Sequence, residues 1–498
     1  MMMKWVKKSV FLCIVLALTT NLHAQTYEQM VSTKKEALDH FNDDKFGMFI
    51  HWGIYSILGG VYKGEKIDDM KSPDPKDGAW IQATGEIPRA EYDQLVKQFN
   101  PILFDADEYV QLIKNAGMKY LVITAKHHDG FALWDSKVST FDMGSTPSKR
   151  DLLQELYDAC QKYGVDFGLY YSHNIDWHDA HDCNIKQYLD FKGEVWPEPA
   201  DFTGQKRRTM GANLWDPSPN TFDDYLYKKA YPQVEELLTK FPNLKIIWYD
   251  FAHFLTAGQS FKFYQMVYKL NPNVIVTDRV GNNFGDFRIP GDNKIPSIEE
   301  MGGKPWETVG TFNNSWGYKS YDNDWKSPYE LIYWITAISS RGGNYMLNIG
   351  PKGDGTIPEQ NVKILHAIGE WMSVNGAAIY GTKRWKVSRE GTAAKKMLGT
   401  GHRETHGFTQ KFTTSDFWFT AKGNKVYVIA LERGKEALIK SFAEENIQQV
   451  KLLGHHKKLR WKQTEEGLSI VLPKNKNKQI GYALEVTLTQ DTEQKELK

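Results

Sequence analysis

Short apolar runs alternate with helical patterns along this chain from about Lys45 to Tyr380, and this alternation limits the folds open to it. Strands that alternate with helices form βαβ units, whose strands are parallel. We therefore predict an α/β fold with a (β/α)8-like barrel of the TIM type, although eight clean units cannot be counted; a doubly wound open sheet is the alternative. The predicted strands are Phe46–His51, Tyr120–Thr124, Phe167–Tyr171, Ile246–Tyr249, Val274–Thr277 and Tyr345–Ile349, and the predicted helices include Asp107–Ala116, Arg150–Tyr163 and Val234–Lys240.

Polar side chains end several of these predicted strands or follow them closely. They are His51, Lys126-His127-His128-Asp129, Ser172-His173, Asp250 and Asp278-Arg279. In barrels of this type the active site lies at the carboxyl ends of the parallel strands. The pattern therefore predicts a catalytic face at this end of the barrel.

The pattern changes after Asn375-Gly376. Segments such as 417–420 and 425–430 alternate apolar and polar residues, and no long helical stretch follows. Such alternation is typical of antiparallel sheets with one buried face. We predict a barrel domain over residues 25–384 and a C-terminal antiparallel β-sandwich over residues 385–490.

The N-terminal residues have the layout of a secretory signal peptide. Three lysines, the last of them Lys8, precede an apolar run from Val10 to Leu18, and the segment ends in Leu22-His23-Ala24. The run is shorter than the roughly 20 residues that span a bilayer. We expect residues 1–24 to be a signal peptide and the protein to be secreted or periplasmic, with no membrane-spanning segment.

Charge and aromatic content narrow the class of ligand. The chain has 62 basic and 61 acidic residues, which gives no electrostatic reason to expect nucleic acid or a charged membrane surface as a partner. It also has 16 tryptophans. Indole rings cover the apolar faces of sugars, so a neutral carbohydrate fits this composition.

Asp250 ends a run, Lys245 to Tyr249, that is typical of a buried strand. A carboxylate at a strand tip can attack the anomeric carbon of a sugar and form a covalent intermediate. The alternative is a purely local role, in which Asp250 caps the next helix.

The adjacent His127 and His128 allow three interpretations: metal ligands with His51, partners of sugar hydroxyls, or buried structural groups. A zinc hydrolase would need a third ligand and a turn that brings two neighbouring side chains together. No metal-binding spacing such as HExxH supports it. We expect neither a metal nor another cofactor.

Seven motifs, in order, resemble glycoside hydrolase family 29, the α-L-fucosidases. The resemblance implies a barrel followed by a β-sandwich and a fucosylated glycan as substrate. The motifs are KFGMFIHWGIYS (45–56), NAGMKYLVITAKHHDGFALWDSK (115–137), SKRDLLQEL (148–156), FGLYYS (167–172), IIWYD (246–250), WETVGTFNNSWGY (306–318) and GGNYMLNIGPKGDGTIP (342–358).

The resemblance also implies roles for individual residues. Asp250 matches the nucleophile of a double-displacement reaction with retention of configuration. The residues implied to bind the sugar are His51, Trp80, His127, His128, Tyr171, Arg279 and Trp316, the last against the methyl end of fucose.

The acid/base residue is harder to place. One branch of the family uses the Glu of a Thr-Pro-Glu segment after the Asp-Arg pair, but residues 286–291 here read DFRIPG. Another branch uses the Glu of a Trp-Glu segment, which matches Glu307. We predict Glu307 as the acid/base, with Glu299 and Glu300 in reserve.

One departure from the family concerns specificity. Members usually carry Glu-Trp after the first strand, whereas this chain has Ala79-Trp80. Loss of a carboxylate that bonds a ring hydroxyl weakens discrimination by about 1–3 kcal/mol when its partner is left unpaired. An α-L-galactosidase acting on L-galactosylated glycans is therefore one alternative. A catalytically silent fucose-binding protein is another, because the Thr-Pro-Glu acid is missing.

Overall fold

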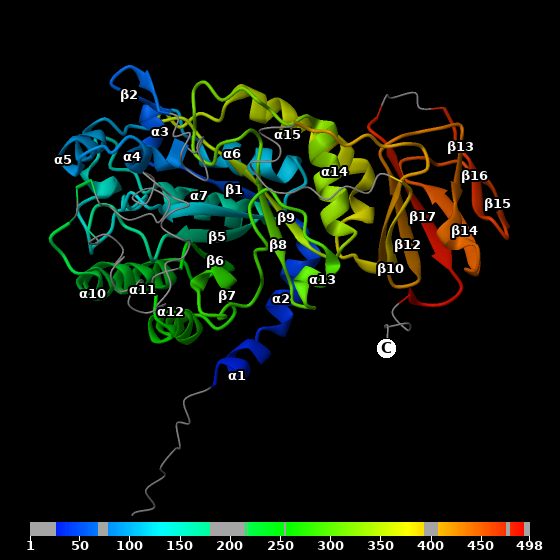
Figure 1. Ribbon diagram of the computed structural model, residues 1–498, viewed down its shortest axis with the longest axis horizontal. Helices are drawn as coiled ribbons and strands as arrows, with labels where there is room; N and C mark the ends of the chain where they lie inside the picture. Colours follow the sequence, from blue (N-terminus) through cyan, green and yellow to red (C-terminus); the bar gives the residue numbers. More distant parts are fainter. Residues whose placement is uncertain are drawn as a thin grey trace, which may run out of the picture.

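The computed structural model of the protein describes residues 26–67, 78–179, 215–216, 218–252, 255–392, 407–474 and 479–492. The predicted signal peptide lies outside these residues. Seven parallel strands form one curled sheet in the order β7-β6-β5-β4-β1-β9-β8 (Figure 1). They are β1 (Phe46–Ile50), β4 (Tyr120–Lys126), β5 (Asp166–Tyr171), β6 (Ile246–Tyr249), β7 (Ile275–Val276), β8 (Glu307–Thr311) and β9 (Asn344–Ile349).

A two-residue segment joins the two edges of this sheet. Thr277 pairs with Phe287 after β7, and Arg288 pairs with Trp306 before β8, as isolated parallel bridges. Residues 287–288 therefore occupy the eighth position without forming a regular strand. The predicted α/β barrel is confirmed as a curled, TIM-like half-barrel, and the curl separates it from a doubly wound open sheet.

The inside of the curl is filled by alternate side chains of the strands. Phe41 of α2 (Lys35–Asp44) closes the amino-terminal end, with its ring centre 5.6 Å from that of Tyr120 and 4.7 Å from that of Phe287. Successive residues of a strand point to opposite faces, so every second residue of each strand faces inward. The inner core comprises Phe41, Phe49, Tyr120, Val122, Tyr170, Ile246, Trp248, Ile275, Phe287, Val309, Trp316 and Met346.

Helices cover the outer face of the sheet and bury it in a second, larger core. The sequence sets their ends: in α7, for example, Asp151 caps the first turn, and Gly164, with a φ of 69°, ends the last. The longer ones are α6 (Ala106–Asn115), α7 (Leu152–Tyr163), α11 (Tyr231–Lys240), α12 (Ala257–Leu270), α14 (Pro328–Ser339) and α15 (Glu359–Asn375), and the shorter ones are α1 (Tyr27–Ser32), α3 (Tyr55–Leu58), α4 (Ile81–Thr84), α5 (Arg89–Tyr92), α10 (Phe222–Tyr225) and α13 (Ile298–Met301).

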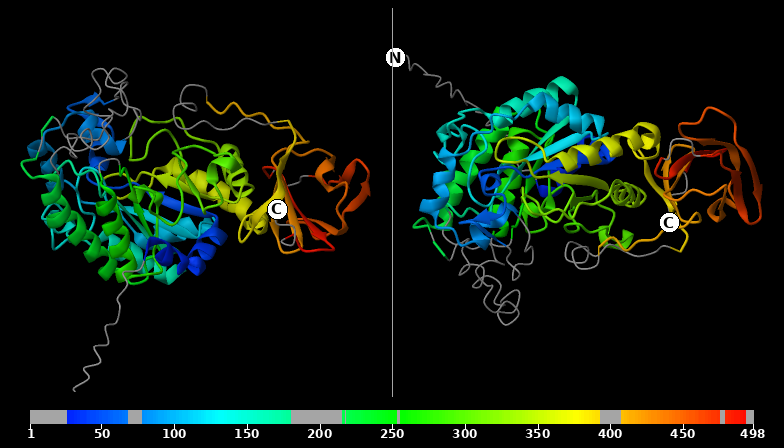
Figure 2. Two further views of the ribbon diagram at one scale, coloured as in Figure 1. Left: turned by 60° about the horizontal axis from the view of Figure 1, so that its bottom comes forward. Right: turned by 90° about the horizontal axis from the view of Figure 1, so that it is seen from above.

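Two antiparallel sheets follow at the C-terminal end, and α14 and α15 lie between them and the parallel sheet (Figures 1 and 2). The two sheets share one apolar core, which gives a sandwich. The first has the order β10-β11-β12-β17-β14 and the second β13-β16-β15. Their strands are β10 (Lys383–Glu390), β11 (Phe417–Lys422), β12 (Lys425–Ala430), β13 (Glu436–Ile439), β14 (Ile447–Leu452), β15 (Arg460–Thr464), β16 (Gly467–Val471) and β17 (Tyr482–Leu488); a small hairpin of β2 (Val61–Tyr62) and β3 (Glu65–Lys66) precedes them in the chain.

Within the described part of the chain, no helix has the length and apolar character that a membrane crossing requires.

Candidate active site

The polar residues predicted at the strand ends do meet at the carboxyl-terminal mouth of the half-barrel. His51 follows β1, His127 and His128 follow β4, Asp250 follows β6, and Arg279 stands in the short helix after β7. Parallel strands bring these ends to one edge of the sheet. The sequence pattern is therefore confirmed as a spatial cluster.

Asp250 is the centre of this cluster. Its Oδ1 accepts a hydrogen bond from Arg279 Nη1 at 2.9 Å, and its Oδ2 accepts one from the Tyr170 hydroxyl at 3.0 Å. His128 Nε2 lies 3.8 Å from the same Oδ2. The next residue, Phe251, has a φ of 59°, a left-handed conformation that is uncommon for a bulky side chain and turns the chain sharply behind the carboxylate.

The Asp250 carboxyl group is held in its charged form. Burial alone would raise its pKa, but the neighbouring Arg279 guanidinium holds that pKa below the usual value for aspartate. Its side chain keeps 16% of its surface exposed, so the carboxylate is reachable from the mouth. A charged, partly exposed carboxylate that accepts two hydrogen bonds is suited to nucleophilic attack.

Three histidines beside Asp250 are neutral. Burial lowers the pKa of His51 to about 4 and that of His128 to about 3, and it lowers the pKa of His127 well below its usual value. The ring centres of His127 and His128 are 4.3 Å apart, and those of His51 and His127 are 5.5 Å apart. A neutral imidazole offers one donor and one acceptor, which matches the hydroxyl groups of a sugar.

Asn348, on β9, ties two predicted sugar contacts together. Its Oδ1 lies 2.6 Å from His51 Nδ1, and its Nδ2 donates to the Trp316 carbonyl at 2.6 Å. The ring centres of His51 and Trp316 are 5.3 Å apart. Asn348 lies in the last of the seven family motifs, but no role was predicted for it from the sequence.

Trp80 lies beside His128, whereas Trp316 lies beside His51. The ring centre of Trp80 lies 5.0 Å from that of His128 and 5.4 Å from that of Trp177. The Trp177 amide donates to the His128 carbonyl at 2.7 Å, which anchors this aromatic pair to the end of β4. The mouth therefore has an aromatic wall on each side of the histidines, formed by Trp80 and Trp316.

The structure corrects the prediction for Tyr171. Tyr171 points outward, is fully buried, and donates its hydroxyl to Gln233 Oε1 at 2.8 Å. Its neighbour Tyr170 belongs to the inner core and bonds Asp250. Adjacent strand residues face opposite sides, so the FGLYYS motif contributes its first tyrosine to the mouth.

This alternation leads to a matched pair of variants. We expect Tyr170→Phe to lower kcat/KM by about 10- to 100-fold, because a hydrogen bond to a charged group contributes about 1.5–3 kcal/mol. Tyr171→Phe removes the same atom from the other face, and we expect it to change thermal stability but not kcat/KM. Steady-state kinetics on both variants checks this; equal losses of activity would contradict the assignment.

Glu307 does not reach the mouth, which corrects its predicted place beside the nucleophile. It is the first residue of β8, paired with Asn344 at the amino-terminal end of the sheet, and is fully buried. Its Oε1 accepts from the Tyr120 hydroxyl at 2.6 Å and its Oε2 from Trp248 Nε1 at 3.4 Å. Trp248 packs its ring against Arg279 as well, so a full indole stands between Glu307 and the Asp250 pair.

Burial of Glu307 makes the stability of the protein depend on pH. Burial raises the pKa of Glu307 from 4.5 to about 8, so the folded chain keeps a proton that the unfolded chain loses. The free energy of unfolding therefore falls by roughly a few kcal/mol as pH rises from about 4.5 to about 8. We expect Glu307→Gln to remove this slope, as measured by urea unfolding at pH 5 and pH 8; parallel pH profiles for both proteins would contradict it.

The two reserve carboxylates also lie away from the mouth. Glu299 and Glu300 are exposed residues of α13. Glu300 accepts from the Ser297 amide at 2.6 Å in a capping box, and its Oε1 lies 3.2 Å from Lys294 Nζ. Both are therefore surface residues, and Glu300 also caps helix α13.

Asp292 is a carboxylate at the mouth that was not predicted from the sequence. Arg279 donates Nη1 to Asp250 and Nη2 to Asp292, so one guanidinium holds both carboxylates. Asn293 fixes the segment against β8: its backbone amide donates to the Val309 carbonyl at 2.8 Å, and its Oδ1 accepts from the Thr311 amide at 3.1 Å. A signal was present in the sequence, since Asp292 follows Pro290-Gly291 close to where the family carries Thr-Pro-Glu.

Two known families match this chain. Residues 14–377 match the family described as alpha-L-fucosidase, and residues 410–489 match the alpha-L-fucosidase C-terminal domain. The first match covers the half-barrel and every mouth residue described above.

Individual relatives agree with these matches. An alpha-L-fucosidase of Dictyostelium discoideum is 30% identical over 364 residues, covering 70% of this chain and 72% of the relative. The crystal structure of an alpha-L-fucosidase from Vibrio sp. strain EJY3 is 29% identical, with a TM-score of 0.74, and covers 92% of this chain and 74% of that one. The alpha-L-fucosidase AlfC from Lactobacillus casei, solved with α-L-fucose product, is 35% identical, with a TM-score of 0.56, and matches 68% of this chain and 98% of that one.

Proposed function

Because this chain belongs to the α-L-fucosidase family, glycoside hydrolase family 29, we propose that it is a retaining exo-α-L-fucosidase that removes terminal α-L-fucose from glycans. The observation that carries the proposal is the Asp250 carboxylate at the mouth, charged and bonded by Arg279 and Tyr170. The neutral histidines and the aromatic walls around it suit a sugar without charge.

In the first half of the reaction, Asp250 attacks the anomeric carbon and the bond to the leaving oxygen breaks. Arg279 and the Tyr170 hydroxyl fix both carboxylate oxygens, which limits the reorganisation that the attack requires. The leaving oxygen takes a proton from a general acid, and a fucosyl ester on Asp250 is formed.

We assign the acid/base role to Asp292: in its protonated form it donates to the leaving oxygen, and in the charged form that pairs with Arg279 it serves as the base. Retaining glycosidases hold their two carboxyl groups about 5–5.5 Å apart. Arg279 donates one Nη atom to Asp250 and the other to Asp292, which makes Asp292 a carboxylate neighbour of Asp250 at the mouth. In the second half of the reaction, Asp292 takes a proton from water, the water oxygen attacks the anomeric carbon, and Asp250 leaves as a carboxylate. No step requires a metal or a cofactor.

The surroundings of Asp250 support fucose as the sugar. His51, His127 and His128 are neutral, so each can donate to and accept from a sugar hydroxyl group. Trp316 lies beside His51 with 7% of its surface exposed, which leaves an apolar surface for the methyl group of fucose. This arrangement favours a 6-deoxy sugar over one with a hydroxyl at that position.

Ala79 motivates the second candidate, an α-L-galactosidase. Its backbone packs so closely against Gly317 that a Cβ atom added to this glycine would lie 2.7 Å from the Ala79 amide nitrogen. Ala79 therefore contacts the loop that carries Trp316.

We expect kcat/KM for 4-nitrophenyl α-L-fucopyranoside to exceed that for the α-L-galactopyranoside by at least about tenfold, because the added hydroxyl meets Trp316. Equal or inverted values would favour the galactosidase, and binding of fucose by calorimetry without cleavage of either compound would favour a silent binding protein.

A further inference from the structure

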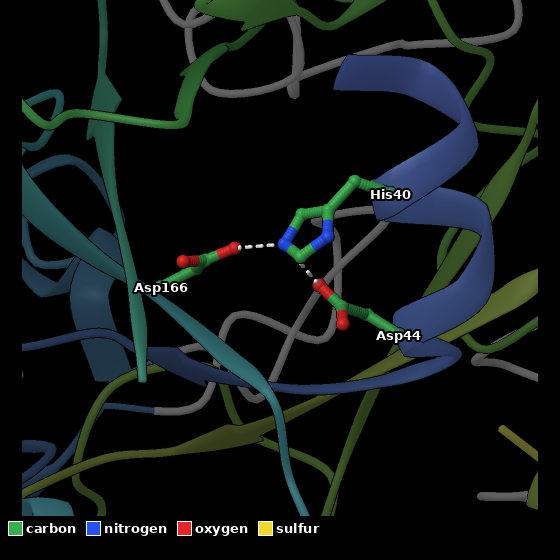
Figure 3. Close-up of side chains that lie close together, drawn as sticks. All are labelled: His40, Asp44 and Asp166. Carbon is green, nitrogen blue, oxygen red and sulfur yellow. Dashed lines mark hydrogen bonds and ion pairs between the residues drawn. The ribbon is translucent and has the colours of Figure 1, made fainter. Parts of the chain in front are cut away.

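A second cluster of functional side chains lies at the opposite end of the half-barrel, away from Asp250. His40 and Asp44 stand one turn apart on α2, and Asp166 is the first residue of β5. Figure 3 shows the imidazole of His40 between the two carboxylates. Among the described residues, this is the one group of three histidine, cysteine or acidic side chains whose ligand atoms all lie within 4.8 Å of one another.

The distances in this cluster are close to those of a coordination sphere. His40 Nε2 lies 2.7 Å from Asp166 Oδ2 and 3.7 Å from Asp44 Oδ2. Ligand atoms at about 2.1 Å from a tetrahedral metal ion are about 3.4 Å from one another. The His40 side chain is 59% exposed and has room to move from its hydrogen bond with Asp166 toward that spacing.

Asp44 has few polar partners among the described residues. Its side chain is 15% exposed, yet within the described chain its carboxylate accepts no hydrogen bond, and its one ion pair is the 3.7 Å contact with His40. The positive charge of Lys119 acts on this partly buried carboxylate, and a bound cation would add to it.

The cluster opens on a pocket of 320 Å³, which leaves room for water to complete a coordination sphere. Glu36 and Asn273 line the same pocket and offer further oxygen atoms. Lys245 also lines it, so the net charge of the pocket is less negative than that of the carboxylates alone. The donor set, one imidazole nitrogen and two carboxylate oxygens, is one that zinc accepts.

We propose that His40, Asp44 and Asp166 bind a zinc ion that fastens α2 to the amino-terminal end of β5. The consequence is structural, because this end of a barrel serves stability rather than chemistry. The same helix carries Phe41, which closes the inner core against Tyr120 and Phe287. Zinc at this site therefore holds Phe41 in place at the amino-terminal end of the inner core.

The test is thermal unfolding of the full chain, freed of metal with a chelator, with and without Zn²⁺. We expect Zn²⁺ to raise Tm by a few degrees and Mg²⁺ to leave it unchanged. His40→Ala and Asp166→Asn should abolish the shift, whereas His456→Ala, which removes an exposed histidine of the C-terminal sheets, should retain it.

A second measurement locates the ion. Crystals grown with Zn²⁺ should give an anomalous difference peak bounded by His40 Nε2 and the two carboxylates. A Tm shift that survives in His40→Ala together with inhibition of cleavage would place zinc at the mouth histidines and overturn the proposal. No shift and no peak in the unaltered protein would also overturn it.

Discussion

Replacing Asp250 by asparagine is expected to lower kcat/KM for 4-nitrophenyl α-L-fucopyranoside by about 10⁴-fold or more. The amide keeps the size of the side chain and its contacts with Arg279 and Tyr170, but it cannot attack the anomeric carbon. Loss of a nucleophile that forms a covalent intermediate removes the whole pathway, so this is the largest effect that the structure predicts.

Two further variants separate this loss from misfolding. Asp135→Asn changes an aspartate whose side chain is 50% exposed and outside the mouth, and we expect it to keep normal activity. Asp250→Gly leaves space beside the anomeric carbon, and added azide should then restore cleavage and release a β-fucosyl azide of inverted configuration. An Asp250→Asn enzyme with normal kcat/KM would refute the assignment.

The second large effect is expected for Asp292→Asn. General acid–base catalysis contributes about 10²–10⁴-fold, and the loss should be greater for a fucosylated glycan, whose leaving group needs a proton, than for the 4-nitrophenyl fucoside. Azide needs no general base, so it should restore turnover and give an α-fucosyl azide of retained configuration. Rate measurements with both substrates, with and without azide, check this prediction.

Glu307→Gln is the matched control for Asp292→Asn. Glu307 holds a proton at neutral pH because burial raises its pKa to about 8, so the glutamine preserves both its size and its lack of charge. We expect kcat/KM to change by less than about tenfold, with no effect of azide. If Glu307→Gln showed the large, azide-rescued loss and Asp292→Asn did not, the two roles would have to be exchanged.

The regular strands could be predicted because their residues are apolar on both faces, as parallel strands covered by helices require. Strand β8 could not: it begins with Glu307 and contains Gly310, so its sequence lacks the apolar run that marked its neighbours. The eighth strand position of the barrel could not be predicted either, because residues 287–288 make only single bridges and form no regular strand.

Site residues that directly follow a strand could be predicted from the sequence. Those whose position depends on a loop or on the direction of a side chain could not. Asp250 and the histidines follow strands directly, and the fold brings them together. Tyr170 and Tyr171 could be told apart only by the register of β5, which the motif does not contain. Asp292 depends on a loop that Arg279 and Asn293 hold in place, and a contact of this kind joins positions that no local pattern connects.

The most direct test of Asp250 as the nucleophile is to trap the covalent intermediate. The enzyme would be incubated with 2-fluoro-fucosyl fluoride, digested, and analysed by mass spectrometry. We predict one fluorofucosyl group per chain on the peptide that contains Asp250, and no label in Asp250→Asn. A label on Asp292, on Glu307 or on no carboxylate at all would contradict the assignment of Asp250 as the nucleophile.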